Sequence, residues 1–246
     1  VPAGSGANAY RVWPCHGYRE SGNDLAGLLR MERRAGDSAN SFTLTVHQEI
    51  INDGAALNVL DASIACRNNE IASPVRWELS SHFVGLDGKR IDDLAVEETV
   101  QVKGGALQVE TQGTIAKRGG SRRLSADWCL FEAVQRLPFR NSAVRAFSLL
   151  EGLSLLREDH RLSYGGRYPV KLGDAVVSLH WFQQLGHGVL PYDYWLDDRH
   201  RLVMVATGPR AYILDEGAED AFRERVQGSR TYQQQRRQQA AGGTSA

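Results

Sequence analysis

One-for-one alternation of apolar and polar residues is the feature of this sequence that most limits its possible folds. In residues 41–50, the apolar side chains of Phe42, Leu44 and Val46 alternate with polar ones. The same two-residue period recurs in later segments, namely 57–66, 75–84, 95–102 and 106–116. Successive side chains of a strand point to opposite faces, so each segment predicts a strand with one buried and one solvated face. That pattern is typical of antiparallel sheets.

Short glycine-rich segments separate these strands at hairpin length, as in NDG at 52–54 and KGG at 103–105. Another strand is predicted near 25–34, and strands resume after residue 159 and continue to 214. We therefore expect a mainly β fold: a curved antiparallel sheet or half-barrel of about ten strands, with two or three short helices packed on its concave face.

Helical spacing of apolar residues appears first in SADWCLFEAVQRLP, which predicts a helix near 127–137. Ser125 or Asp127 can cap its start, and Pro138 ends it. Two further helices are predicted near 147–157 and 217–227. The domain organisation expected is a flexible segment 1–9, a single β domain 10–227, and a Gln/Arg-rich tail 228–246 that is either loose or extends the last helix.

The bulk composition excludes several classes of protein. The chain has 246 residues, 42% of them hydrophobic, which is enough for a sizeable core. Its 29 basic and 29 acidic residues balance, so no net field favours nucleic acid. No stretch of about 18 apolar residues predicts a transmembrane segment. The start VPAGSGANAY is typical either of a mature N-terminus left after a targeting segment is removed or of the boundary of an expressed fragment.

No catalytic motif stands out, and no catalytic residue, metal or cofactor is predicted. GxSxG and phosphate-binding glycine motifs are missing, and the histidines lack metal-ligand spacing. The polar stretch 186–200 contains His187, Asp193 and His200, which would serve a hydrolase in an alternative interpretation. In the structural interpretation, the tip of this stretch is a hairpin turn whose charged residues are solvated.

Three cysteines, at positions 15, 66 and 129, allow one disulfide with three choices of pair, or none. Cys66 falls on the apolar face of a predicted strand, which favours a small buried hydrophobe.

The aromatic residues of the strands carry the binding hypothesis. The candidate ligand-binding residues are Trp77, Phe83, Trp181, Tyr192 and Tyr194. Trp77, Phe83 and Trp181 are expected on inward faces, with Trp181 sharing its face with Val177 and Leu179. Two interpretations follow: these rings pack on the helices as ordinary core, or they line a groove for a lipid or acyl chain.

Three segments of the second half carry a family resemblance: DWCLFEAVQRLP, FSLLEGLSLLREDHRLSYGG, and GHGVLPYDYWLDDRHRLVMVATGPRAYILD. Over roughly 125–215 the chain resembles a group of exported bacterial proteins with a domain of unknown function. That group is distantly similar to periplasmic lipoprotein carriers of the LolA and LolB type. The resemblance implies a half-barrel, a periplasmic or secreted location and, by fold analogy alone, lipid binding. It carries over no catalytic residue.

We therefore expect a non-catalytic exported envelope protein that binds an apolar ligand or a partner protein in or beside a half-barrel groove. The alternatives are a hydrolase with a site near 186–200, and a structural assembly partner with a filled core. No nucleic-acid partner is expected.

Overall fold

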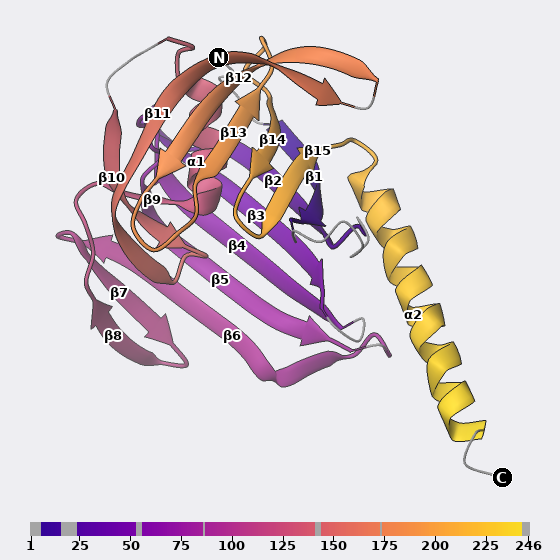
Figure 1. Cartoon of the computed structure of the whole chain (residues 1–246). Coiled ribbons are helices and arrows are strands. Elements are labelled where there is room, and N and C mark those ends of the chain that lie inside the picture. Colours follow the sequence, from indigo (N-terminus) through magenta and orange to yellow (C-terminus); the bar gives the residue numbers. More distant parts are fainter. Residues whose placement is uncertain are drawn as a thin grey trace.

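A computed structural model describes residues 6–15, 24–52, 56–85, 87–140, 144–172 and 174–242. Within these ranges lies one sheet of 15 strands and two α-helices (Figure 1). The strands are β1 (Gly6–Pro14), β2 (Gly27–Ala35), β3 (Ser41–Ile51), β4 (Leu57–Arg67), β5 (Pro74–Val84), β6 (Arg90–Lys103), β7 (Ala106–Thr111), β8 (Thr114–Arg118), β9 (Leu124–Ala126), β10 (Arg145–Glu151), β11 (Leu155–Leu172), β12 (Ala175–Leu185), β13 (Tyr192–Leu196), β14 (Leu202–Ala206) and β15 (Arg210–Leu214).

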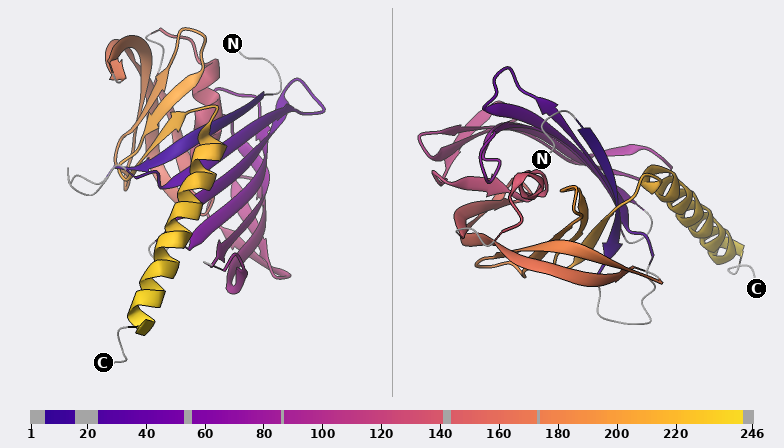
Figure 2. Two further views of the ribbon diagram at one scale, coloured as in Figure 1. Left: turned by 90° about the vertical axis from the view of Figure 1, so that its right-hand side faces the viewer. Right: turned by 90° about the horizontal axis from the view of Figure 1, so that it is seen from above.

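The strand order shows two meanders joined at the middle of the sheet. It runs from β8 back to β1, then from β15 back to β9, so β1 pairs with β15 and the edges are β8 and β9. The pairs are antiparallel except β9 with β10, which is parallel. Seen from above, the two arms of the sheet curve around α1 (Asp127–Ala133) (Figure 2). The predicted mainly β, curved antiparallel fold is confirmed, with more strands than the ten expected.

The core lies between the concave face of the sheet and α1, which continues into a 3-10 turn, Val134–Arg136. Cys129, Leu130 and Val134 are fully buried there. Phe131 makes edge-to-face contacts with tyrosines from three strands, Tyr10, Tyr194 and Tyr212. Such pairs each add about 0.5–1.5 kcal/mol beyond simple burial, so α1 is held from both arms of the sheet.

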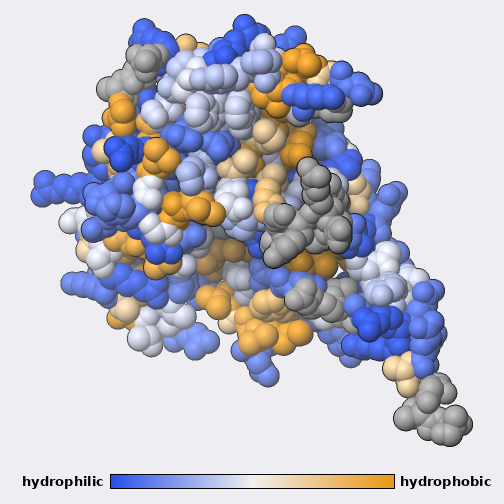
Figure 3. All heavy atoms as spheres, in the orientation of Figure 1, coloured by the Kyte–Doolittle hydropathy of each residue, from blue (hydrophilic) through white to orange (hydrophobic). Residues whose placement is uncertain are grey.

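Helix α2 (Ala218–Gly242) packs on the outer face of the sheet, not on the concave face as expected. Ala218, Phe222 and Val226, spaced by four, form a small second core with residues such as Leu28 and Leu57. The helix continues well beyond residue 227, and its far half is exposed, polar and directed away from the body (Figures 1 and 3). In the part of the chain that the structure describes, no helix is long and apolar enough to cross a membrane.

Three local predictions were wrong. Residues 147–157 are not a helix but the end of β10, a turn, and the start of β11. A bulge between Phe147 and Leu149 lets the consecutive residues Leu149 and Leu150 both enter the core. The apolar residues of this strand therefore do not alternate one for one, and their spacing resembles that of a helix. Residues 6–9, expected to be flexible, pair in β1. Neither expected cap is used, because α1 begins after Ala126 without a side-chain cap.

Candidate functional site

The structure does not gather the five predicted ligand-binding residues at one place. Trp77 and Tyr194 are buried in the main core, with exposed fractions of 1% and 0%. Phe83 is partly exposed near the end of β5, opposite Asn58 of β4. Tyr192 is half-buried and lines an inner cavity. Of these five residues, Tyr192 lines a cavity that the described residues form.

Trp181 faces away from the core, so its predicted orientation was wrong. Its ring stacks on Trp195 of the neighbouring strand with centroids 5.9 Å apart, and its indole N–H donates to Asp193 Oδ1 at 2.9 Å. The residues of β12 that face the core are instead Phe182 and Gln184, each fully buried.

Buried polar groups explain this reversal of faces. The Tyr194 hydroxyl donates to Gln184 Oε1 at 2.6 Å, and Gln184 Nε2 shares a hydrogen bond with His160 Nδ1 at 3.0 Å. Likewise, the Tyr164 hydroxyl and His180 Nδ1 are 2.8 Å apart. Since the inward polar side chains of β12 have partners, hydropathy alone assigns the wrong face.

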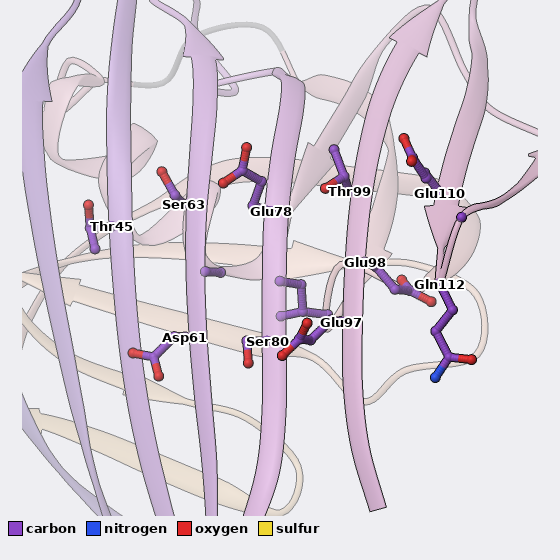
Figure 4. A pocket seen from close by; sticks show the side chains of 13 residues that line it. Thr45, Asp61, Ser63, Glu78, Ser80, Glu97, Glu98, Thr99, Glu110 and Gln112 are labelled. Atoms are coloured by element: carbon purple, nitrogen blue, oxygen red, sulfur yellow. The ribbon is translucent and has the colours of Figure 1, made fainter. Parts of the chain in front are cut away.

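A hollow of about 500 Å³ lies on the outer face of β3–β7 (Figure 4). Register places its polar side chains in rows directly across the strands, one of which is Thr45, Ser63, Glu78, Thr99 and Glu110. Hydroxyl residues separate the carboxylates, which avoids direct like-charge pairs across strands. The hollow is open and its carboxylates are largely exposed, as for Glu78, so we interpret it as a solvated acidic surface.

A smaller cavity of about 230 Å³ lies inside the half-barrel beside the start of α1. Segments far apart in the chain meet there: α1, the turn between β10 and β11, the start of β13, and the turn between β14 and β15. Its wall has an aromatic part, Trp128, Phe131, Tyr192 and Tyr212, and a polar part, Gln48, Asp127, Glu151 and Arg210. Such a mixture of rings with a few convergent polar groups is typical of small-molecule sites.

Asp127 is the most unusual group of this cavity. Its Oδ2 accepts a hydrogen bond from the Gly152 backbone N–H at 2.8 Å. Its Oδ1 is enclosed and has no hydrogen-bond partner among the described residues. Burial raises the pKa of this carboxyl from 3.8 to about 7; the Gly152 bond opposes the rise and the charge of Glu151 adds to it. The group therefore titrates near neutral pH and keeps one oxygen unsatisfied.

The neighbouring tyrosines respond to the same environment. Burial raises the pKa of Tyr192, and the nearby acids Asp127 and Glu151 raise it further, while Arg210 lowers it. Burial also raises the pKa of Tyr212. Glu151 itself is paired with Arg157 at 3.0 Å. Asp127 is thus the carboxyl of this wall without a cationic partner in the described structure.

The residues proposed for a hydrolase do not converge. His187 is exposed and lies 3.7 Å from Asp159. Asp193 accepts hydrogen bonds on the outer face, and the ring of His200 stacks on Phe139. No group of three or more metal-ligating side chains occurs within the described ranges.

Sequence reasoning gave no sign of Asp127 as a site residue, since it was assigned to a helix cap. Its role depends on Gly152, which lies 25 residues later. An acidic residue beside the buried Trp128, at the start of an apolar helix, is the only local signal.

No protein-family model matches this sequence, and no curated protein matches it significantly. Among solved structures, the chain is similar to a β-barrel-like protein of Domain of Unknown Function DUF1849 from Brucella abortus. The TM-score is 0.55 at 11% sequence identity, over 87% of this chain and 97% of the other. At this identity the similarity shows the fold alone, a β-barrel-like domain.

Proposed function

We propose that this protein is a non-catalytic binding protein that holds a small amine with an apolar body in its inner cavity. The observation that carries the proposal is the carboxyl group of Asp127, which lines a cavity together with aromatic rings and has no cationic partner in the described structure. An ammonium group in the cavity would lie beside this carboxyl group and favour its charged form. The rings of Tyr192, Tyr212 and Trp128 would contact the apolar part and can attract a cation through their faces.

The size of the cavity narrows the ligand class. At about 230 Å³ it is smaller than the roughly 300–1,000 Å³ of drug-sized sites. A lipid with long acyl chains, expected from the sequence, would need space that the packed core around Trp77 and Tyr194 fills. A compact ligand therefore fits better than a whole lipid, and lipid binding stays a prediction.

Calorimetry and thermal shifts with a panel of small aromatic and aliphatic amines test the proposal, with alcohols and carboxylic acids of the same shape for comparison. We expect amines to bind best, and Asp127→Asn to lower their affinity by about tenfold or more. Asp220→Asn on the exposed start of α2 is the matched control and should bind as the wild type does. Equal binding of all three ligand classes, or full retention in Asp127→Asn, would refute a role of the carboxyl.

Two further parts of the expected function remain proposals. The envelope location is supported by the resemblance of the second half to exported proteins, and fractionation of cells that express the complete gene tests it.

The assembly-partner alternative is supported by the filled main core. Native mass spectrometry of protein purified without detergent distinguishes the two functions: a small added mass favours ligand binding, and a protein complex favours assembly.

A further inference from the structure

Two buried thiols face each other beneath α1. Cys66 of β4 and Cys129 of α1 lie 63 residues apart in sequence, yet their Sγ atoms are 3.7 Å apart. Their exposed fractions are 1% and 0%. Cys15, by contrast, is exposed at the end of β1. The structure thus brings together one of the three possible cysteine pairs.

A charged network surrounds Phe42, the neighbour of Cys66 on the adjacent strand. Phe42 lies directly opposite Cys66 in the register of β3 and β4. The guanidinium groups of Arg33 and Arg136 stand over the Phe42 ring, at 4.7 and 5.6 Å from its centroid. Both arginines bind the carboxylate of Glu132 at 2.9 Å. The two cysteines therefore lie in the core beside a strand residue that this network covers.

We propose that Cys66 and Cys129 form a disulfide when the chain folds in the presence of a disulfide oxidant. One thiol loses its proton and attacks a sulfur of the oxidant, which releases one thiol and leaves a mixed disulfide. The second cysteine then displaces the other half of the oxidant as a thiol. Two protein thiols are oxidised to one S–S bond, and the oxidant disulfide is reduced to two thiols. The reaction closes the sulfur–sulfur distance from 3.7 Å to a bond of ~2.05 Å.

The surroundings of the pair determine when the reaction takes place. In the folded protein, the hydrogen bond with Cys129 and burial raise the pKa of Cys66, so its reactive thiolate is scarce. An oxidant also cannot reach sulfur atoms buried to this extent. The exchange therefore takes place before α1 packs, and the bond then ties α1 to β4, two residues from Asp127.

Refolding of the full chain tests the inference. Reduced, unfolded protein is refolded with a mixture of reduced and oxidised glutathione, then denatured without reductant and alkylated with iodoacetamide. Peptide mass spectrometry locates the cross-link. Cys15→Ala is the main variant because it leaves only Cys66 and Cys129. The intact mass of this variant should be about 2 Da lower when the two cysteines are bonded than when both are reduced.

We expect the 66–129 cross-linked peptide in the wild type and in Cys15→Ala, with neither cysteine alkylated. Omission of oxidised glutathione should leave both cysteines alkylated. Full alkylation after refolding with oxidised glutathione, in protein whose circular dichroism is native, would overturn the inference. So would a dominant cross-link from Cys15 to either buried cysteine in the wild type.

Discussion

Replacement of Asp127 by asparagine should change how the stability of this protein depends on pH. Asparagine keeps an oxygen that can accept the Gly152 hydrogen bond but has no charge to bury. In the wild type, the carboxyl has a pKa of about 7 in the folded state, against 3.8 for the ordinary group. Between these two pH values the folded state binds a proton that the unfolded state has released. The stability contributed by this group is therefore complete below about pH 3.8 and is lost as pH rises through 7.

The size of the effect follows from the same two values. A rise from 3.8 to about 7 corresponds to at most about 4 kcal/mol of stability between acidic and mildly alkaline pH. Asp127 is only half-buried, so solvent screens part of this energy. We expect Asp127→Asn to match the wild type within about 1 kcal/mol near pH 4 and to exceed it by about 2 kcal/mol near pH 8.

Urea unfolding of both proteins at intervals from pH 4 to 8.5 measures this difference. Subtraction of the two curves removes the titration of the shared groups, so the remaining slope belongs to Asp127. Asp220→Asn should give a flat difference, since that carboxylate is exposed. Two results would refute the argument that burial destabilises the charged form. One is a stability difference between Asp127→Asn and the wild type that does not change with pH, and the other is a variant that loses stability relative to the wild type as pH rises.

Three other measurements follow from the packing. Trp77→Ala should cost about 3–5 kcal/mol in urea unfolding, as large truncations in a core do, and Trp181→Ala on the outer face about half as much; the reverse order would contradict the assigned faces. Reduction of the proposed disulfide should lower the free energy of unfolding by about 4 kcal/mol, because it closes a loop of 63 residues; unfolding with and without reductant measures this, and an unchanged midpoint would argue against it. Hydrogen bonds with Glu49 and Asp61 raise the pKa of His47 to about 9. Its NMR titration should therefore have a midpoint well above 6.5, and the midpoint should move toward 6.5 in Glu49→Gln. The stabilisation from this cluster is complete below about pH 6.5 and is lost as pH rises through 9.

The sequence was most informative where each strand has one wet and one dry face. In β3 the inward positions Phe42, Leu44 and Val46 are all buried, as the two-residue period predicts. The same rule is less reliable near 106–116, where it predicts one strand. There Gln112 and Gly113 have φ values of 50° and 76° and turn the chain between β7 and β8. Unrecognised tight turns of this kind account for part of the higher strand count.

Prediction failed where the spacing of apolar residues does not show how the strands turn and pair. Gly152 and Leu153 both adopt positive φ, 56° and 61°, and so reverse the chain inside a segment that reads as an apolar helix. Glycine signals such a turn, but a leucine in the left-handed region gives no sequence signal. In β12 the core-facing polar residue Gln184 misled the assignment in the same way, because its partners come from other strands.

The candidate site could not have been predicted for a related reason. Asp127 is recognisable as a polar residue beside an apolar helix, and a cap is the reasonable local interpretation. What distinguishes it is the closure of the sheet, which brings the turn at Gly152 and the start of β13 against α1 and makes Asp127 part of the wall of a small cavity. An ionisable group with a strongly raised pKa in a concave, partly aromatic wall is a feature that stability alone does not favour. A neutral side chain would cost less at this position, and this cost is the physical reason for the ligand that we propose there.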